Sequence, residues 1–174
     1  MKRMEETKER SDFIPRVKKI IMAITVVLLV VTMAIIYYSV RLPSKSVIAH
    51  STKIEKISFL YLKGTNMIPY LIEFEDKSEE LNQLMSILDS VSYTRSPRSF
   101  FSRNIRNDGD PTFAFIIFYR DRDGEMKDYF LDMNRGGYVL RGGKKMYKMV
   151  DREKEVFDQL STWLFEKAVR MPVT

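Results

Sequence analysis

A run of 21 consecutive residues without a charge, glycine or proline constrains this chain more than any other feature of its sequence. It extends from Ile20 to Val40 and reads IIMAITVVLLVVTMAIIYYSV. A helix of this length is about 30 Å long, which matches the hydrocarbon core of a bilayer. A surface helix of a soluble domain has one polar face, whereas this run is apolar on every side, so it predicts a transmembrane helix.

The charges on either side of this run predict its orientation. Seven basic residues precede the run, whereas residues 41–56 contain four. Positive residues near a membrane helix stay on the cytoplasmic side. We therefore expect residues 1–19 to form a cytoplasmic basic tail, residues 20–40 to form a single-pass transmembrane helix, and everything after Val40 to lie outside the cell membrane.

A cleaved signal peptide is the alternative interpretation of the same segment. Val47 and Ala49 match the small-residue pattern of a cleavage site, with the cut before His50. However, the apolar run is longer than the roughly 7–15 residues of an ordinary signal core. The site also lies nine residues beyond the end of the run. These lengths favour a retained anchor.

Three hydroxyl side chains recur at intervals of seven within the run, namely Thr25, Thr32 and Ser39. Since they share one helix face, they could mediate self-association or contact with another membrane helix. The alternative is that each hydroxyl bonds to a carbonyl of its own helix. We favour the second interpretation, because measured hydrogen bonds between membrane helices average less than about 1 kcal/mol.

The residue types exclude several kinds of chemistry. The chain has no cysteine, so it has no disulfide, thiolate zinc site or cysteine nucleophile, and His50 is its only histidine. Signatures of phosphate loops, nucleophile elbows and zinc helices are absent from the sequence. We therefore predict no catalytic residue, no metal ligand and no cofactor, and consider an enzyme less well supported than a non-enzymatic protein.

The segment DRDGE, Asp121 to Glu125, resembles the start of a calcium-binding loop. An EF-hand loop with Gly124 at its sixth position would begin at Tyr119 and end at Phe130, and neither can supply a carboxylate. Asp-Gly between two alternating strands is instead a strong signal for a hairpin. We expect a hairpin turn here.

Beyond a linker at residues 41–53, alternating and helical patterns predict a compact domain at residues 54–174. The expected order is ββα, then four strands, then a final helix. Strands joined by short turns imply an antiparallel sheet, so we predict an α+β domain with about six strands and two helices on one face. The expected elements are strands at 54–62, 68–75, 112–119, 126–133, 138–140 and 145–150, and helices that begin at Ser78 and near Asp151.

The stretch RSPRSFFSRNIR combines four arginines with two adjacent phenylalanines and contains no acidic residue. This combination is typical of nucleic-acid grooves, but a position outside the membrane removes that ligand. We therefore expect a loop that contacts phosphate-bearing lipid, wall polymer or an acidic protein, and no nucleic acid. The alternatives are a disordered loop, or a loop whose phenylalanines fill the core. The candidate residues are Arg95, Arg98, Phe100, Phe101, Arg103 and Arg106.

A second basic stretch extends from Arg135 to Lys148. Its two Arg-Gly-Gly triplets are typical of RNA-binding segments, but glycines at both ends of a short strand predict turns. The part after Arg41 contains 21 basic and 19 acidic residues, so it is not a polycation. The basic stretches could equally pair with acidic ones on the folded surface. The candidate contact residues are Arg135, Arg141, Lys144 and Lys145.

The layout resembles the small single-pass or lipid-anchored extracytoplasmic α+β proteins of unknown function found in Gram-positive bacteria. The anchor, the FIIFYRDRDGEMKDYFL hairpin (115–131) and the segment GGYVLRGGKKMYKM (136–149) carry this resemblance. It implies no active-site residue, and the chain lacks the cysteine of lipid-anchored members.

The expected function is that of a membrane-anchored extracytoplasmic binding or accessory protein. Its outer domain would dock on a membrane-protein partner or an anionic envelope component. The alternative is a cell-envelope hydrolase, or an inhibitor of one, whose carboxylates are brought together by folding.

Overall fold

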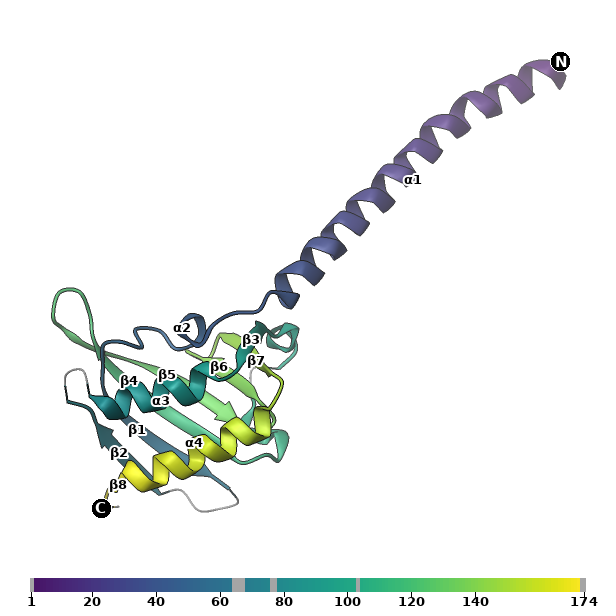
Figure 1. Cartoon of the computed structure of the whole chain (residues 1–174). Helices are drawn as coiled ribbons and strands as arrows, with labels where there is room; N and C mark the ends of the chain where they lie inside the picture. The colour runs from purple at the N-terminus through teal and green to yellow at the C-terminus, as the bar shows by residue number, and fades with distance from the viewer. Residues whose placement is uncertain (1, 64–67, 76–77, 103, 173–174) are drawn as a thin grey trace. The chain divides into compact units, whose positions relative to one another are not determined.

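The computed structural model describes residues 2–63, 68–75, 78–102 and 104–172, with side chains from residue 17 onward. The chain divides into two compact units, one ending at Ser39 and the other beginning at Val40 (Figure 1). The first unit is a single helix, and the second is an α+β domain. Each unit is described by itself.

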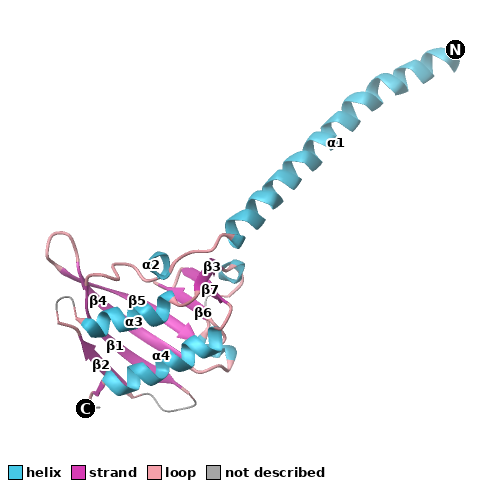
Figure 2. Cartoon of the chain, in the orientation of Figure 1, coloured by secondary structure: helices cyan, strands magenta, loops and turns pink. Residues whose placement is uncertain are grey.

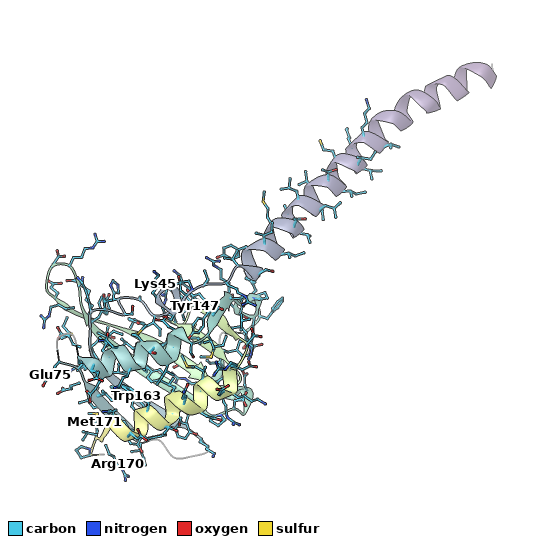
Figure 3. All side chains as sticks on the ribbon, in the orientation of Figure 1. Lys45, Glu75, Tyr147, Trp163, Arg170 and Met171 are labelled. Carbon is cyan, nitrogen blue, oxygen red and sulfur yellow. The ribbon has the colours of Figure 1, made fainter. Side chains whose placement is uncertain are left out.

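Helix α1 (Lys2–Ser39) contains a segment, Val17–Ser39, that is long and apolar enough to span a membrane. Its apolar side chains project on all sides and are exposed (Figure 3). The Thr25 hydroxyl donates to the Ile21 carbonyl at 2.9 Å, and Thr32 donates to Leu28 at 2.8 Å. These two hydroxyls therefore bond within their own helix, as the favoured interpretation of their spacing predicts.

The second unit is built around one antiparallel sheet of eight strands. The strand order is β3-β7-β6-β5-β4-β1-β2-β8 (Figure 2). The elements are α2 (Ser44–Val47), β1 (Ile54–Leu62), β2 (Pro69–Glu73), α3 (Glu79–Asp89), β3 (Ser92–Arg95), η1 (Pro97–Phe100), η2 (Arg106–Asp108), β4 (Thr112–Arg120), β5 (Met126–Asn134), β6 (Tyr138–Arg141), β7 (Lys145–Val150), α4 (Glu153–Lys167) and β8 (Val169–Arg170).

The α+β class and the antiparallel sheet are confirmed, but the expected number of six strands is wrong. The two additional strands are β3 and β8, and both lie at the edges of the sheet. β3 has four residues and buries one of them deeply, Tyr93, while both residues of β8 are exposed. Strands of two to four residues contain too few alternating positions to produce a period-two pattern. Their formation depends instead on pairing with the neighbouring strand.

Helices α3 and α4 cover one face of the sheet (Figure 2). The Ser78 hydroxyl caps α3 by accepting from the Leu81 amide at 3.2 Å, at the residue where the sequence predicts the helix to begin. Trp163 on α4, labelled in Figure 3, donates its Nε1 to Oε1 of Gln83 on α3 at 3.2 Å. The core between the helices and the sheet includes Ile57, Phe59, Leu84, Leu88, Phe113, Phe115, Ile117, Leu131, Met133, Phe157, Leu160 and Leu164.

Residues 41–53, which the sequence presents as a linker, pack on the domain. Leu42 forms an antiparallel bridge to Tyr93, with N–O distances of 2.7 and 2.9 Å. Val47 and Ile48 are 0% and 2% exposed, so both belong to the core. The segment contains only a four-residue helix and a single bridge, so few of its side chains are buried. Its sequence therefore shows neither a helical nor a strand period.

The chain between β3 and β4 covers part of the face opposite the helices. Ile105 is fully buried there against Leu140, Met146 and Tyr138, which form a small second core. The Asn134 amide donates to the Ile105 carbonyl at 3.2 Å. This loop therefore covers the half of the sheet around β6 and β7.

Candidate binding surfaces

Two arginines of the loop between β3 and β4 are held by carboxylates of the same domain. Arg98 Nη1 donates to Asp108 Oδ2 at 2.6 Å, and its guanidinium lies 4.7 Å from the ring centre of Tyr138. The hydrogen bond from Arg98 holds the pKa of Asp108 below its usual range. Arg106 makes a two-point contact with Asp132 at 2.9 and 2.8 Å. These pairs fix the loop, and they engage the charges of Arg98 and Arg106 within the domain.

The second basic stretch is also largely paired within the domain. Arg135 makes a two-point contact with Asp158 on α4 at 2.9 and 2.7 Å, and this lowers the pKa of Asp158. Arg141 donates to the carbonyls of Ser46 and Val47 at 3.0 and 2.9 Å. The basic stretch and the acidic stretch at α4 therefore meet on the folded surface, as the alternative interpretation of the charge blocks supposes.

Lys144 and Lys145 differ from these arginines. Both lie at the turn between β6 and β7 and are exposed, and the described part of the chain offers neither of them an ion pair. Arg95 is half-buried in β3 opposite Tyr147. The remaining candidate, Arg103, lies outside the described residues.

Phe100 and Phe101 do not fill the core, since they are 74% and 90% exposed. Ile105 fills the space beneath the loop instead. The backbone around the two rings is nevertheless ordered, because the Ser96 hydroxyl accepts from the Arg98 amide at 3.3 Å and the Phe101 amide donates to the Arg98 carbonyl at 2.9 Å. The alternative in which the two phenylalanines fill the core is therefore wrong. The apolar residue that is buried is Ile105, which the sequence does not distinguish from them.

A second apolar surface lies on the half of the sheet that neither the helices nor the loop cover. We define the open-face patch as the side chains Leu60, Leu71, Ile116, Phe118 and Phe130. The strand register places them on one face, because Ile116 is paired with both Ser58 and Phe130, and Ser58 with Leu71. Phe130 is 55% exposed, and the other four are partly exposed.

Charged side chains of both signs border the open-face patch. Glu73, Lys56, Phe118 and Asp128 follow one another across four neighbouring strands. The Lys56 ammonium lies 4.7 Å above the Phe118 ring. Sequence reasoning missed this surface, although TFAFIIFY in β4 is apolar on both faces. That pattern indicates a strand covered on both sides, and within the described residues only one side is covered.

Two polar hollows lie near the start of the domain and bear on the enzyme alternative. One, of about 520 Å³, is lined by serine and threonine hydroxyls together with Lys45, Asn82 and Asp89. The other, of about 440 Å³, contains Glu55, Glu75 and Asp121. Glu55 pairs with Arg120 at 2.6 Å. A hydrogen bond from Lys127 lowers the pKa of Asp121, and a lowered pKa opposes a role of Asp121 as a general acid.

The described residues show neither a metal site nor an unsatisfied polar group aimed at a ligand. They contain no group of three or more His, Asp or Glu side chains that could hold a metal ion. Every buried side-chain nitrogen or oxygen among them has a hydrogen-bond partner. His50 stacks on Tyr119 with ring centres 4.0 Å apart. The hydrolase alternative therefore gains no specific support from this part of the chain.

No protein-family model matches this sequence, and neither a curated protein nor a solved structure shows significant similarity to it. The surfaces described above are thus the basis for inferring function.

Proposed function

We propose that this chain is a single-pass, membrane-anchored binding or accessory protein, with its N-terminus in the cytoplasm and its α+β domain outside. The open-face patch would dock on a membrane-protein partner. The observation that carries this proposal is the uncovered apolar half of the sheet, with Phe130 at its most exposed position.

The composition of the open-face patch favours a protein as its partner. Contiguous apolar surface with a polar rim is characteristic of protein interfaces, where a dry centre is surrounded by charged residues. The rim carries Lys56 as well as Glu73 and Asp128, so it is not suited to a purely anionic polymer. Of the five candidate arginines that the structure describes, Arg98, Arg106 and Arg135 are already paired with carboxylates of the domain.

Packing of residues 41–53 supports retention of the anchor. Cleavage before His50 would remove Val47 and Ile48 from the core and Leu42 from its bridge to Tyr93. The cleaved domain would thus lose buried apolar surface and two backbone hydrogen bonds. Retention also keeps the domain near other proteins of the same membrane, which raises the effective concentration of such partners.

Photo-crosslinking in native membranes tests the proposed docking surface. A photoreactive amino acid would replace Phe130 in one variant and Glu166, which is exposed on α4, in a matched control. We expect a discrete protein adduct from position 130 and none from position 166. Absence of a protein adduct at 130, or the same adducts at both positions, would contradict the proposal. An adduct with a second copy of this chain would replace the partner by a homodimer.

A further inference from the structure

We infer that a second surface of the domain contacts the lipid bilayer itself. This aromatic–basic edge consists of Phe100 and Phe101 in the loop after β3 and of Lys144 and Lys145 in the neighbouring β6–β7 turn. The inference rests on the proposed function only in requiring that α1 spans a membrane. It does not require a protein partner or a particular orientation across the membrane.

The connection between α1 and the domain is short. Only Val40 and Arg41 separate the end of α1 at Ser39 from Leu42. Since each residue spans at most about 3.6 Å, Leu42 lies within roughly 11 Å of the end of that helix. Leu42 is bridged to Tyr93, so the domain is attached through β3.

The direction of the bridge selects one end of β3. In an antiparallel bridge, the residues before one partner run beside the residues after the other. Val40 and Arg41 therefore approach Leu42 from the end of the bridge to which Thr94 and Arg95 lead. That end continues directly into η1, which carries Phe100.

The two lysines lie at the same end of the adjacent strand. Arg95 is paired with Tyr147, and the Ser96 amide donates to the Met146 carbonyl at 2.9 Å. The ladder between β3 and β7 therefore continues to the start of β7, where Lys145 follows the turn that contains Lys144. The aromatic loop and the basic turn are consequently neighbours.

The loop is ordered in a way that keeps its two rings exposed. The Arg98 and Asp108 side chains are only 27% and 20% exposed, so this ion pair is partly buried and ties the loop to the domain. With the loop fixed, Phe101 stays 90% exposed, and transfer of its ring into an apolar medium is favourable.

Lipid chemistry suits both parts of the aromatic–basic edge. Aromatic rings bind at the boundary between headgroups and acyl chains, and lysines are attracted to the phosphates of anionic lipids. The bilayer that holds α1 is the apolar phase nearest to the point of attachment. Phe100 and Phe101 would therefore insert at the interface, with Lys144 and Lys145 at the level of the headgroups.

Spin labelling of the full chain in lipid nanodiscs tests this inference. The chain has no cysteine, so a single cysteine gives one labelling site. Ser102→Cys reports on the loop and keeps both rings, whereas Lys63→Cys reports on an exposed residue directly after β1. We expect the label at 102 to lose collisions with a water-soluble nickel chelate and gain collisions with oxygen, relative to the label at 63.

Two further variants assign the contact to its chemistry. In the Ser102→Cys background, replacing Phe100 and Phe101 by serine should return the label to water. Replacing Lys144 and Lys145 by glutamine should reduce its depth in nanodiscs that contain phosphatidylglycerol and have little effect in pure phosphatidylcholine. No response to the serine variant would overturn the assignment of the rings.

The nanodisc experiment separates failure of the inference from failure of the anchor. Elution of the chain together with the nanodisc reports insertion of α1, independently of the label at 102. If the chain elutes with the nanodisc while this label is as accessible to nickel as the label at 63, the lipid contact is refuted and the anchor stands. If the chain elutes without the nanodisc, both are refuted.

Discussion

At the scale of single residues, the loop between β3 and β4 separates side chains that look alike in the sequence. Phe100, Phe101 and Ile105 are all apolar, yet the first two are exposed and the third is fully buried. The stretch contains no period that distinguishes them, because the burial of Ile105 depends on Leu140 and Met146, which lie far along the chain. Local sequence therefore predicts the loop but not the role of each residue.

Ile105→Ala should lower the free energy of unfolding of the domain by about 2–4 kcal/mol, because it leaves a cavity in the small second core. Phe101→Ala, the matched variant in the same loop, should change it by less than about 0.5 kcal/mol, since its side chain is exposed. Denaturant titration of the two variants measures the difference. Equal effects would contradict the assigned burial.

Asp108 should make the order of this loop depend on pH. The bond from Arg98 lowers the pKa of Asp108 in the folded protein, so its contribution is fully present above the ordinary value near 3.8. The contribution is lost as the pH falls through the lowered folded-state pKa. We expect the amides of Phe101 and Ser102, which both donate to the Arg98 carbonyl, to lose protection from hydrogen exchange in that acidic range.

The Asp108→Asn variant is the control for this pH dependence. It removes the charge that holds Arg98, so the two amides should exchange faster at neutral pH and change less with acidification, after correction for intrinsic exchange rates. Asp158 is shifted in the same direction by Arg135 and contributes to global acid stability, which is why a local probe is needed. Retention of the wild-type pH profile in Asp108→Asn would contradict the role of this pair.

At the scale of secondary structure elements, the two Arg-Gly-Gly triplets form turns, as the sequence predicts. Both contain glycines with positive φ, but their surroundings differ. A Cβ at Gly137 (φ +79°) would lie 2.6 Å from the Cβ of Glu153 on α4, whereas a Cβ at Gly142 (φ +58°) would meet nothing within 4 Å. The first turn is therefore packed against a helix, and the second is open.

Gly137→Ala should consequently destabilise the domain more than Gly142→Ala. The second variant bears only the cost of a left-handed alanine, about 1–2 kcal/mol, whereas the first adds a steric clash with α4. Thermal unfolding of the two variants provides the comparison, with a larger decrease in Tm expected for Gly137→Ala. A larger decrease for Gly142→Ala would contradict the packing of the β5–β6 turn on α4.

The segment before β1 provides a third comparison among elements. Ile48→Ala should cost about 2–4 kcal/mol of unfolding free energy, because the side chain is 2% exposed and packs in the main core. Lys45→Ala, on the exposed side of α2, should change it by less than about 0.5 kcal/mol. Chemical denaturation distinguishes these values. An Ile48→Ala effect as small as that of Lys45→Ala would mean that the segment is a linker after all.

The sequence predicts elements with a clear period and misses those defined by their neighbours. Helix α3 follows from apolar residues at helical spacing, whereas β4 follows from an uninterrupted apolar run. β8 and the bridge at Leu42 depend on the strand beside them and carry no such pattern. For the candidate surfaces, the ion pairs of Arg106 and Arg135 join residues 26 and 23 positions apart, and local spacing does not predict such contacts.

At the scale of the whole molecule, the two units have opposite relations to water. Most side chains of Val17–Ser39 are apolar and exposed, which is favourable only in lipid or against a partner, whereas the second unit has an ordinary core. The domain in turn presents two apolar surfaces, the open-face patch and the aromatic–basic edge. The docking proposal rests on the uncovered half of the sheet, and the lipid-contact proposal rests on the two-residue connection between α1 and Leu42.

The topology of the full chain is therefore the most direct test of this account. A chain with a C-terminal tag would be expressed in cells whose outer membrane surface is accessible to protease. The cells would be treated with protease before and after lysis. We predict that the tag is digested on intact cells and that the undigested protein has the full mass of 20.5 kDa plus the tag. Digestion only after lysis, or a mature N-terminus at His50, would contradict the account.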